Sequence, residues 1–256
     1  MILKEKLNER ALSYGSWLTI GDLSVTEIMA KTGFDWLAID MEHTAITIAQ
    51  AQAMIAVIEL NKVAPLVRVG ENSAYLIKRV MDAGAHGVIV PMVNSKADAE
   101  KAVAAVKYPP VGTRGVGLSR AQKYSLDLES YRQWNQESSI VIVQLEHYKA
   151  VENIEEIMSV KGVDGFIIGL YDLSGSLGCP GEFDNPKVVR ALNDILNKSK
   201  EKGYLMGFHV VDPASKVVID KIEQGFKFIA VGTDFIFLSQ SCNRCLSNIR
   251  AGLIKD

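Results

Sequence analysis

Two acidic residues stand where apolar runs of the sequence end. Glu146 closes the run SIVIVQLE, and Asp172 follows the run GFIIGLY. At the ends of adjacent strands, the two carboxylates would approach one another and offer hard oxygen ligands to a divalent cation. A small 2-oxo acid and water would complete the coordination. The structural alternative is that each acid caps a following helix or is solvated at a rim.

A histidine and an arginine follow two earlier apolar runs. His43 comes just after DWLAIDM and is a candidate general base, because an imidazole titrates near neutral pH. Arg68 ends the run APLVR, which otherwise suits a buried strand, so its permanent charge needs an anionic partner. That partner is either a substrate oxyanion or one of the acids Asp40 and Glu42.

The remaining histidines carry weaker signals. His86 falls in a connection between a predicted helix and a predicted strand, and His209 falls within a predicted strand. We interpret both as structural residues. His147 follows Glu146 directly, and its role stays open.

Eight short runs rich in Val, Ile, Leu and Phe would position these residues. Each run is continuously apolar, as a strand buried on both faces by helices must be. We predict strands at 14–20, 35–41, 64–69, 87–93, 139–146, 164–170, 205–211 and 226–232.

Stretches of helical periodicity alternate with these strands, several of them opened by Ser or Asp and closed by Gly. We predict helices at 24–32, 46–61, 73–83, 95–107, 153–160, 186–202 and 213–224. Eight βα units favour a (β/α)8 TIM barrel that forms one domain over residues 1–256. The rival is a doubly wound open sheet, but GDLS after the first strand is not the Gly-rich dinucleotide turn that such a sheet favours.

One segment interrupts the alternation. Residues 109–138 contain two prolines and three glycines within PPVGTRGVG, which predicts an ordered excursion on the barrel. The excursion either borders a site or is a long surface connection.

Composition excludes several classes of protein. The chain has 256 residues, 48% of them hydrophobic, and 28 Lys and Arg against 30 Asp and Glu, so it can bury a full core and presents no basic surface for nucleic acid. No apolar run is long enough for a membrane helix or a signal core, which predicts a cytoplasmic protein. Three cysteines fit a reducing compartment, and Cys242 and Cys245 are interpreted as two helix positions.

Several chemistries that barrels support lack the residues that they need. No predicted strand ends in the lysine that a Schiff-base aldolase needs, since Lys149 and Lys161 lie elsewhere. Glycine-rich nucleotide motifs are absent. The seventh and eighth strand ends lack a glycine-rich phosphate cradle, which disfavours a phosphosugar substrate.

The pieces FDWLAIDMEH, PLVRVG, MDAGAHGVIVPMV, KYPPVGTRGVG, VQLE and GVDGFIIGLYDLSGSLG occur in this order. Together they resemble the signatures of the HpcH/HpaI aldolases, which are metal-dependent class II pyruvate aldolases. The resemblance runs from about Gly15 to Gly232. It implies reversible cleavage of a 4-hydroxy-2-oxo acid to pyruvate and an aldehyde, through a pyruvate enolate whose charge is stabilised by Mg²⁺, Mn²⁺ or Co²⁺.

The resemblance also implies roles for individual residues. His43 would be the base, Arg68 would stabilise the oxyanion, and Asp82 would raise the basicity of the histidine. Our own interpretation places Asp82 near the end of a helix, far from the barrel mouth. The implied ligands are Glu146 and Asp172 for the metal, and Gln144, Tyr171 and Asp172 for the pyruvate unit.

One motif departs from the family pattern. Members usually read Gly-Pro-x-Asp-Leu-Ser where this chain has GLYDLS at 169–174. The acid is kept, but Tyr171 beside it is bulky and can form hydrogen bonds, which bears on substrate scope. Two alternatives remain, a citryl-CoA or malyl-CoA lyase and a non-catalytic barrel that binds a 2-oxo acid.

The segment after the eighth strand is more apolar than one side of a terminal helix requires. Residues 234–254 read DFIFLSQSCNRCLSNIRAGLI. Members of the family exchange C-terminal helices between barrels, which implies a homo-oligomer, most simply a hexamer. The alternative is a monomer whose helix closes its own barrel.

Overall fold

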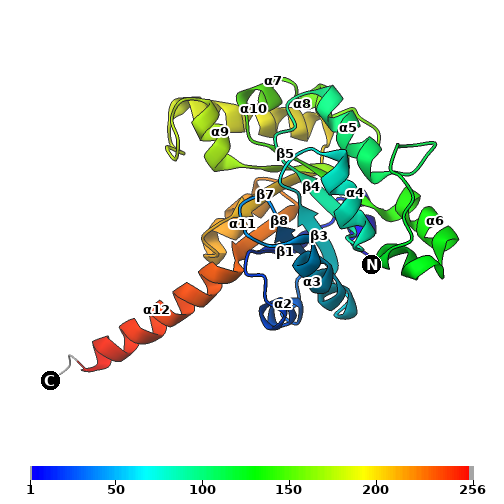
Figure 1. Ribbon diagram of the computed structural model, residues 1–256. Helices are drawn as coiled ribbons and strands as arrows, with labels where there is room; N and C mark the ends of the chain where they lie inside the picture. Colours follow the sequence, from blue (N-terminus) through cyan, green and yellow to red (C-terminus); the bar gives the residue numbers. More distant parts are fainter. Residues whose placement is uncertain (1, 254–256) are drawn as a thin grey trace.

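Eight parallel strands close into a barrel in the order β1 to β8 (Figure 1). The computed structural model describes residues 2–253. Each strand pairs in parallel with its sequence neighbour, and β8 pairs with β1. The strands are β1 (Ser13–Leu18), β2 (Trp36–Asp40), β3 (Ala64–Arg68), β4 (Gly87–Val90), β5 (Ile140–Leu145), β6 (Gly165–Ile168), β7 (Met206–Val210) and β8 (Phe228–Thr233).

Helices form the outer layer of this barrel (Figure 1). The α-helices are α1 (Leu3–Asn8), α2 (Leu23–Ala30), α3 (Ile48–Leu60), α4 (Ala74–Asp82), α5 (Lys96–Val106), α6 (Leu128–Ser138), α7 (Tyr148–Glu152), α8 (Ile154–Met158), α9 (Leu170–Ser176), α10 (Pro186–Lys202), α11 (Ser215–Glu223) and α12 (Asp234–Leu253). A 3-10 helix, η1 (Arg120–Ser125), precedes α6. The (β/α)8 barrel predicted from the sequence is confirmed, and each predicted strand overlaps an observed one.

Aromatic side chains fill one end of the barrel interior. Trp36 stacks on Phe228 with ring centroids 4.1 Å apart, and both side chains are fully buried. Gly15 makes room for this pair, because a Cβ atom built on it would lie 2.0 Å from the Trp36 ring. The interior is therefore a packed core, and the open space lies at the barrel mouth.

Residues 109–138 form an ordered excursion, as predicted, with η1 and α6 within it. It follows α5, which returns the chain to the end of the barrel where the strands begin. There Arg114 forms an ion pair with Asp82 at the last position of α4. Within one chain, the excursion therefore lies at the end opposite the mouth and does not border the candidate site.

Helix α12 projects away from the barrel (Figure 1). It contains Cys242 and Cys245, both exposed, which confirms their prediction as helix positions. Residue 254 of the predicted terminal segment lies outside the described residues. Within residues 2–253, no helix has the length and hydropathy needed to cross a membrane.

Candidate active site

The polar residues predicted from strand ends converge at the mouth of the barrel. Arg68 is the last residue of β3, Glu146 follows β5, and Asp172 lies in the first turn of α9 after β6. A cavity of about 600 Å³ is lined by Arg68, Asp172 and, among others, His43 and Gln144. Four of the residues expected from the sequence therefore line one cavity, and Glu146 lies behind Gln144.

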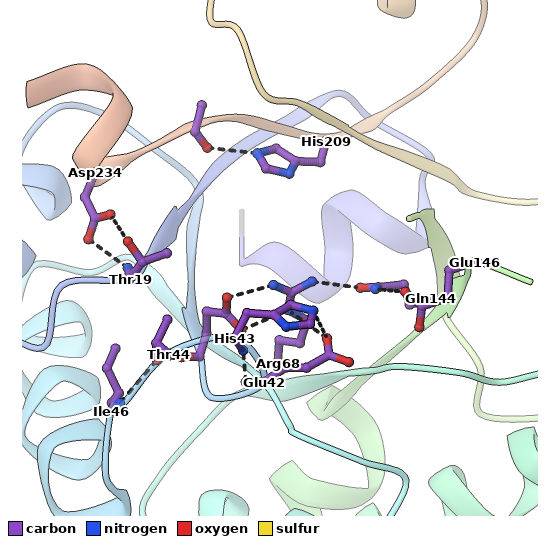
Figure 2. A network of polar contacts seen from close by, with 12 residues as sticks. Thr19, Glu42, His43, Thr44, Ile46, Arg68, Gln144, Glu146, His209 and Asp234 are labelled. Carbon is purple, nitrogen blue, oxygen red and sulfur yellow. Dashed lines mark hydrogen bonds and ion pairs between the residues drawn. The ribbon is translucent and has the colours of Figure 1, made fainter. Parts of the chain in front are cut away.

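Arg68 is held by acids on the preceding strand. Its Nε and Nη2 atoms donate to the two oxygens of Asp40 at 3.0 and 2.7 Å, and Nε also lies 3.3 Å from Glu42 (Figure 2). The guanidinium packs over the Trp17 ring, 4.4 Å from its centroid. Burial opposes ionisation of Asp40, but the hydrogen bonds and charge of Arg68 outweigh it and lower the pKa of this carboxyl.

One edge of the guanidinium still faces the cavity. Arg68 Nη1 makes only a long contact of 3.5 Å with Gln144 Oε1 among the residues that the structure describes. The sequence left open whether Arg68 pairs with a substrate oxyanion or with the acids Asp40 and Glu42. In the structure these acids hold one edge of the guanidinium. The other edge is free to donate to a negatively charged oxygen of a ligand.

The carboxylate of Glu146 is fixed from two sides. One oxygen accepts from the backbone N–H of Met92 at 2.6 Å. The other accepts from the Gln144 amide, as Figure 2 shows. Met92 has a φ of 53°, a left-handed conformation that non-glycine residues rarely adopt, so backbone strain is placed directly at the site. Gly169 passes so close that a Cβ on it would lie 2.7 Å from Glu146 Oε2.

Acidic groups outnumber cations in this space. Burial raises the pKa of Glu146, the Gln144 and Met92 donors lower it, and the nearby Asp172 carboxylate raises it. Burial likewise raises the pKa of Glu42 to about 7, with Arg68 opposing and the charges of Glu146 and other acids adding to the effect. A bound cation would relieve this repulsion.

Glu146 and Asp172 line a second cavity of about 670 Å³. Both offer carboxylate oxygens, which are suitable ligands for Mg²⁺, Mn²⁺ or Co²⁺. Within residues 2–253 no three His, Cys, Asp or Glu side chains are grouped as a metal site. Two carboxylates suit a hard divalent ion whose other positions are taken by water or substrate.

His43 lies at the edge of the same space. Its Nε2 atom is 3.6 Å from Glu42 Oε2, and 61% of its side chain is exposed (Figure 2). Asp40 accepts the backbone N–H groups of Glu42 and His43, which fixes the turn after β2. The imidazole is thus positioned beside the cavity and open to a ligand.

Tyr171 contributes part of the cavity wall. Its ring is 61% exposed and packs edge-on against Phe183, with centroids 4.8 Å apart. Both residues line the cavity of about 600 Å³. Tyr171, which stands beside Asp172 in the GLYDLS motif, therefore lines the same cavity as this acid.

Asp82 is not brought to this site within one chain. It ends α4 and pairs with Arg114 and Gln122 at the opposite end of the barrel. This agrees with the sequence-based placement near a helix end.

Trp17 was not predicted from the sequence as a site residue, and His209 was interpreted as a structural residue. Both line the cavity beside Arg68. Each lies on a strand whose apolar pattern signals burial, and nothing in the pattern shows which residues face the mouth. His147 caps α7 by accepting the N–H of Lys149, and it also lines the cavity beside Glu146.

A family model described as HpcH/HpaI aldolase/citrate lyase matches residues 13–240. The chain belongs to this family. It is 35% identical over 250 residues to the 2-keto-3-deoxy-L-rhamnonate aldolase of Salmonella gallinarum, covering 97% of this chain and 92% of the relative.

Solved structures give the same result. A family protein from Burkholderia cenocepacia has a TM-score of 0.91 at 32% identity, with 97% of this chain and 98% of that chain covered. An aldolase of the family from Desulfitobacterium hafniense has a TM-score of 0.89 at 30% identity, with 98% and 97% covered. The predicted family, barrel and carbon–carbon lyase activity are confirmed by these similarities.

Proposed function

We propose that the protein cleaves a 4-hydroxy-2-oxo acid reversibly into pyruvate and an aldehyde. The observation that carries the proposal is that His43, Arg68, Gln144 and Asp172 line one cavity. Glu146 lines a neighbouring cavity that shares Asp172, and it accepts a hydrogen bond from Gln144. The relatives named 2-keto-3-deoxy-L-rhamnonate aldolase support the class of substrate.

The chain's own residues account for proton transfer and charge stabilisation. His43 takes the proton from the 4-hydroxyl group, and the electrons of the broken bond between carbons 3 and 4 pass to the keto oxygen. Arg68 donates to that oxygen as its negative charge develops, held in position by Asp40. The proton taken by His43 is then available to carbon 3, which becomes the methyl group of pyruvate.

Glu146 and Asp172 would hold the divalent ion, with Gln144 and the backbone near Tyr171 contacting the pyruvate unit. Such an ion supplies Lewis-acid stabilisation of negative charge on the 2-oxo acid. Gln144 is 3% exposed and donates to Glu146, so it also fixes the orientation of this ligand.

The role implied for Asp82 requires a second copy of the chain. Within one chain Asp82 pairs with Arg114 beneath the barrel, so it acts on His43 only from a neighbouring subunit. We also propose a homo-oligomer, most simply a hexamer. The exposed apolar side chains of α12 support it, namely Phe235, Leu238, Leu246, Ile249 and Leu253.

A pyruvate-release assay tests the activity. The purified protein with Mg²⁺, Mn²⁺ or Co²⁺ is screened with 4-hydroxy-2-oxo acids derived from short and long aldehydes, beginning with 2-keto-3-deoxy-L-rhamnonate. We expect release that a chelator abolishes and that the metal restores. Borohydride with pyruvate should trap no covalent adduct, and trapping would overturn the mechanism.

Two further arms separate the alternatives. Cleavage of a malyl-CoA thioester without cleavage of any free acid would indicate a CoA lyase. Binding of oxalate without decarboxylation of oxaloacetate would indicate a non-catalytic binding protein.

A further inference from the structure

The cavity at the mouth has a lobe that extends away from the two proposed metal ligands. This polar lobe has a volume of about 470 Å³, and its walls include Trp17, Thr19, Thr44, Arg68, His209 and Thr233. Figure 2 shows His209 on one side of the Arg68 guanidinium, while Glu146 lies beyond Gln144 on another. A ligand chelated near Glu146 therefore reaches the lobe with the part that lies past Arg68.

Two of the residues that line this lobe carry a buried polar atom without a partner. Trp17 Nε1 and Thr233 Oγ1 form no hydrogen bond with any residue that the structure describes. Their residues are only 3% and 6% exposed. By contrast, Thr19 donates to Asp234, and Thr44 donates to the backbone of Asp40. Leaving a buried donor unpaired is costly, so these two atoms indicate a place for a polar ligand group.

His209 supplies an acceptor to the same lobe. Its Nε2 atom lies 3.1 Å from the carbonyl oxygen of Gly232, and a carbonyl only accepts. Burial lowers the pKa of His209 to about 4, so the ring is neutral at pH 7. Nε2 therefore carries the proton, and Nδ1 is left as an acceptor.

The charges around the lobe disfavour an anionic ligand group. Arg68 is already paired with Asp40 and Glu42, and Asp40 itself lines the lobe. A second carboxylate on the substrate would be repelled by Asp40 and by the lone pair on His209 Nδ1. A hydroxyl group both donates and accepts, which matches an indole N–H, a threonine hydroxyl and an imidazole nitrogen.

We propose that the polar lobe binds a hydroxyl group that the substrate carries beyond its keto carbon, with Trp17 donating, His209 accepting and Thr233 doing either. The inference rests on the proposed aldolase function and names a substrate class within it. The preferred substrates carry an uncharged hydroxylated chain beyond the 2-oxo acid unit, and substrates with a second carboxylate are disfavoured. The hydroxyl belongs either to the aldehyde half or to carbon 3 of the 2-oxo acid.

Aldol addition by the metal-loaded enzyme distinguishes the two sources. In one arm pyruvate is combined with glycolaldehyde or acetaldehyde, which differ by one hydroxyl. In the other arm acetaldehyde is combined with 3-hydroxypyruvate or pyruvate. We expect Thr233→Val to lower the ratio of kcat/KM for the hydroxylated over the unhydroxylated partner roughly three- to tenfold in one arm, as loss of one hydrogen bond to a neutral group does.

Matched variants control for folding and for the loss of a hydroxyl in general. Thr233→Ser keeps the hydroxyl and should retain the ratio. Thr113→Val makes the same exchange at an exposed position under the barrel and should also retain it. The proposal would be overturned if Thr233→Val lowered kcat/KM equally for the hydroxylated and the unhydroxylated partner in both arms. It would also be overturned if the unmodified protein preferred succinic semialdehyde, which carries a carboxylate, over butanal.

Exchange of the pyruvate methyl protons with D₂O tests the proposed function separately, because it needs no aldehyde. If the methyl protons exchange but Thr233→Val leaves the kcat/KM ratio unchanged, the proposed hydroxyl site is rejected and the aldolase function is retained. Absence of both exchange and addition would reject the aldolase function, and the lobe proposal with it.

Discussion

The Asp40 carboxylate accepts two hydrogen bonds from the Arg68 guanidinium, at 3.0 Å from Nε and 2.7 Å from Nη2. This pairing occupies one edge of the guanidinium and turns Nη1 toward Gln144 and the cavity. A lysine would keep the charge but could not reproduce the planar, two-bond geometry. We therefore expect Arg68→Lys to lower kcat for pyruvate release about 100- to 1000-fold, as loss of an oxyanion donor does.

The control for this variant is Arg79→Lys. Arg79 is an exposed residue of α4 that packs over Tyr75, away from the mouth. It should retain the activity of the unmodified protein. Full activity in Arg68→Lys would show that the charge alone suffices and that its two-bond geometry does not matter.

Gly169 is predicted to control metal affinity. An added Cβ would lie 2.7 Å from Glu146 Oε2 and 3.1 Å from Gln144 Nε2, so both side chains must move. We expect Gly169→Ala to weaken Mn²⁺ binding about 10- to 100-fold, which is typical when the support of a ligand is disturbed. Titration followed by electron paramagnetic resonance measures the affinity. Gly115→Ala is the control, since a Cβ there meets nothing within 4 Å, and equal affinities in the two variants would contradict the assignment of Glu146.

The barrel could be predicted from the sequence because its strands are buried on both faces, which leaves continuous apolar runs. Helix α1 was missed since its six residues carry mixed charge, and α6 was missed within a segment whose prolines and glycines suggested irregular structure. Site residues at strand ends were found because the topology of a barrel places those ends together.

Residues inside the strands were harder to assign. His209 lies in MGFHV, where an apolar pattern on both sides does not show whether a side chain faces the mouth or the helices. Trp17 presents the same ambiguity in SYGSWL. The unpaired Nε1 atom of Trp17 and the acceptor Nδ1 of His209 can be recognised only in the structure, where β1, β7 and β8 lie together around Arg68.

Stability should depend on pH through His209. Its pKa is about 4 in the folded protein against an ordinary value of 6.5, so the unfolded chain binds this proton more readily. The folded state consequently loses stability as the pH falls from about 6.5 to 4, and the contribution is fully present above that range. Between pH 7 and pH 5 this one group should cost about 2 kcal/mol of unfolding free energy.

Urea unfolding of the protein and of His209→Gln at the two pH values isolates this effect, because all other titrating groups are shared. We expect the variant to lose about 2 kcal/mol less than the unmodified protein on acidification. Equal losses would mean that His209 is not held neutral by burial.

Helix α12 exposes apolar side chains in the single chain. Leu246 and Ile249 are 50% and 53% exposed on a helix that extends away from the barrel (Figure 1). An apolar helix face of this kind is stable in water when a second chain covers it. Light scattering should therefore give a mass of about six times the 28.1 kDa of the chain.

The double variant Leu246→Asp with Ile249→Asp should dissociate the assembly, because a charge cannot be buried there without a partner. Ser247→Asp adds a charge at an exposed polar position of the same helix and should leave the assembly intact. A mass near 28.1 kDa for the unmodified protein at micromolar concentration would show that α12 has no second chain to cover it.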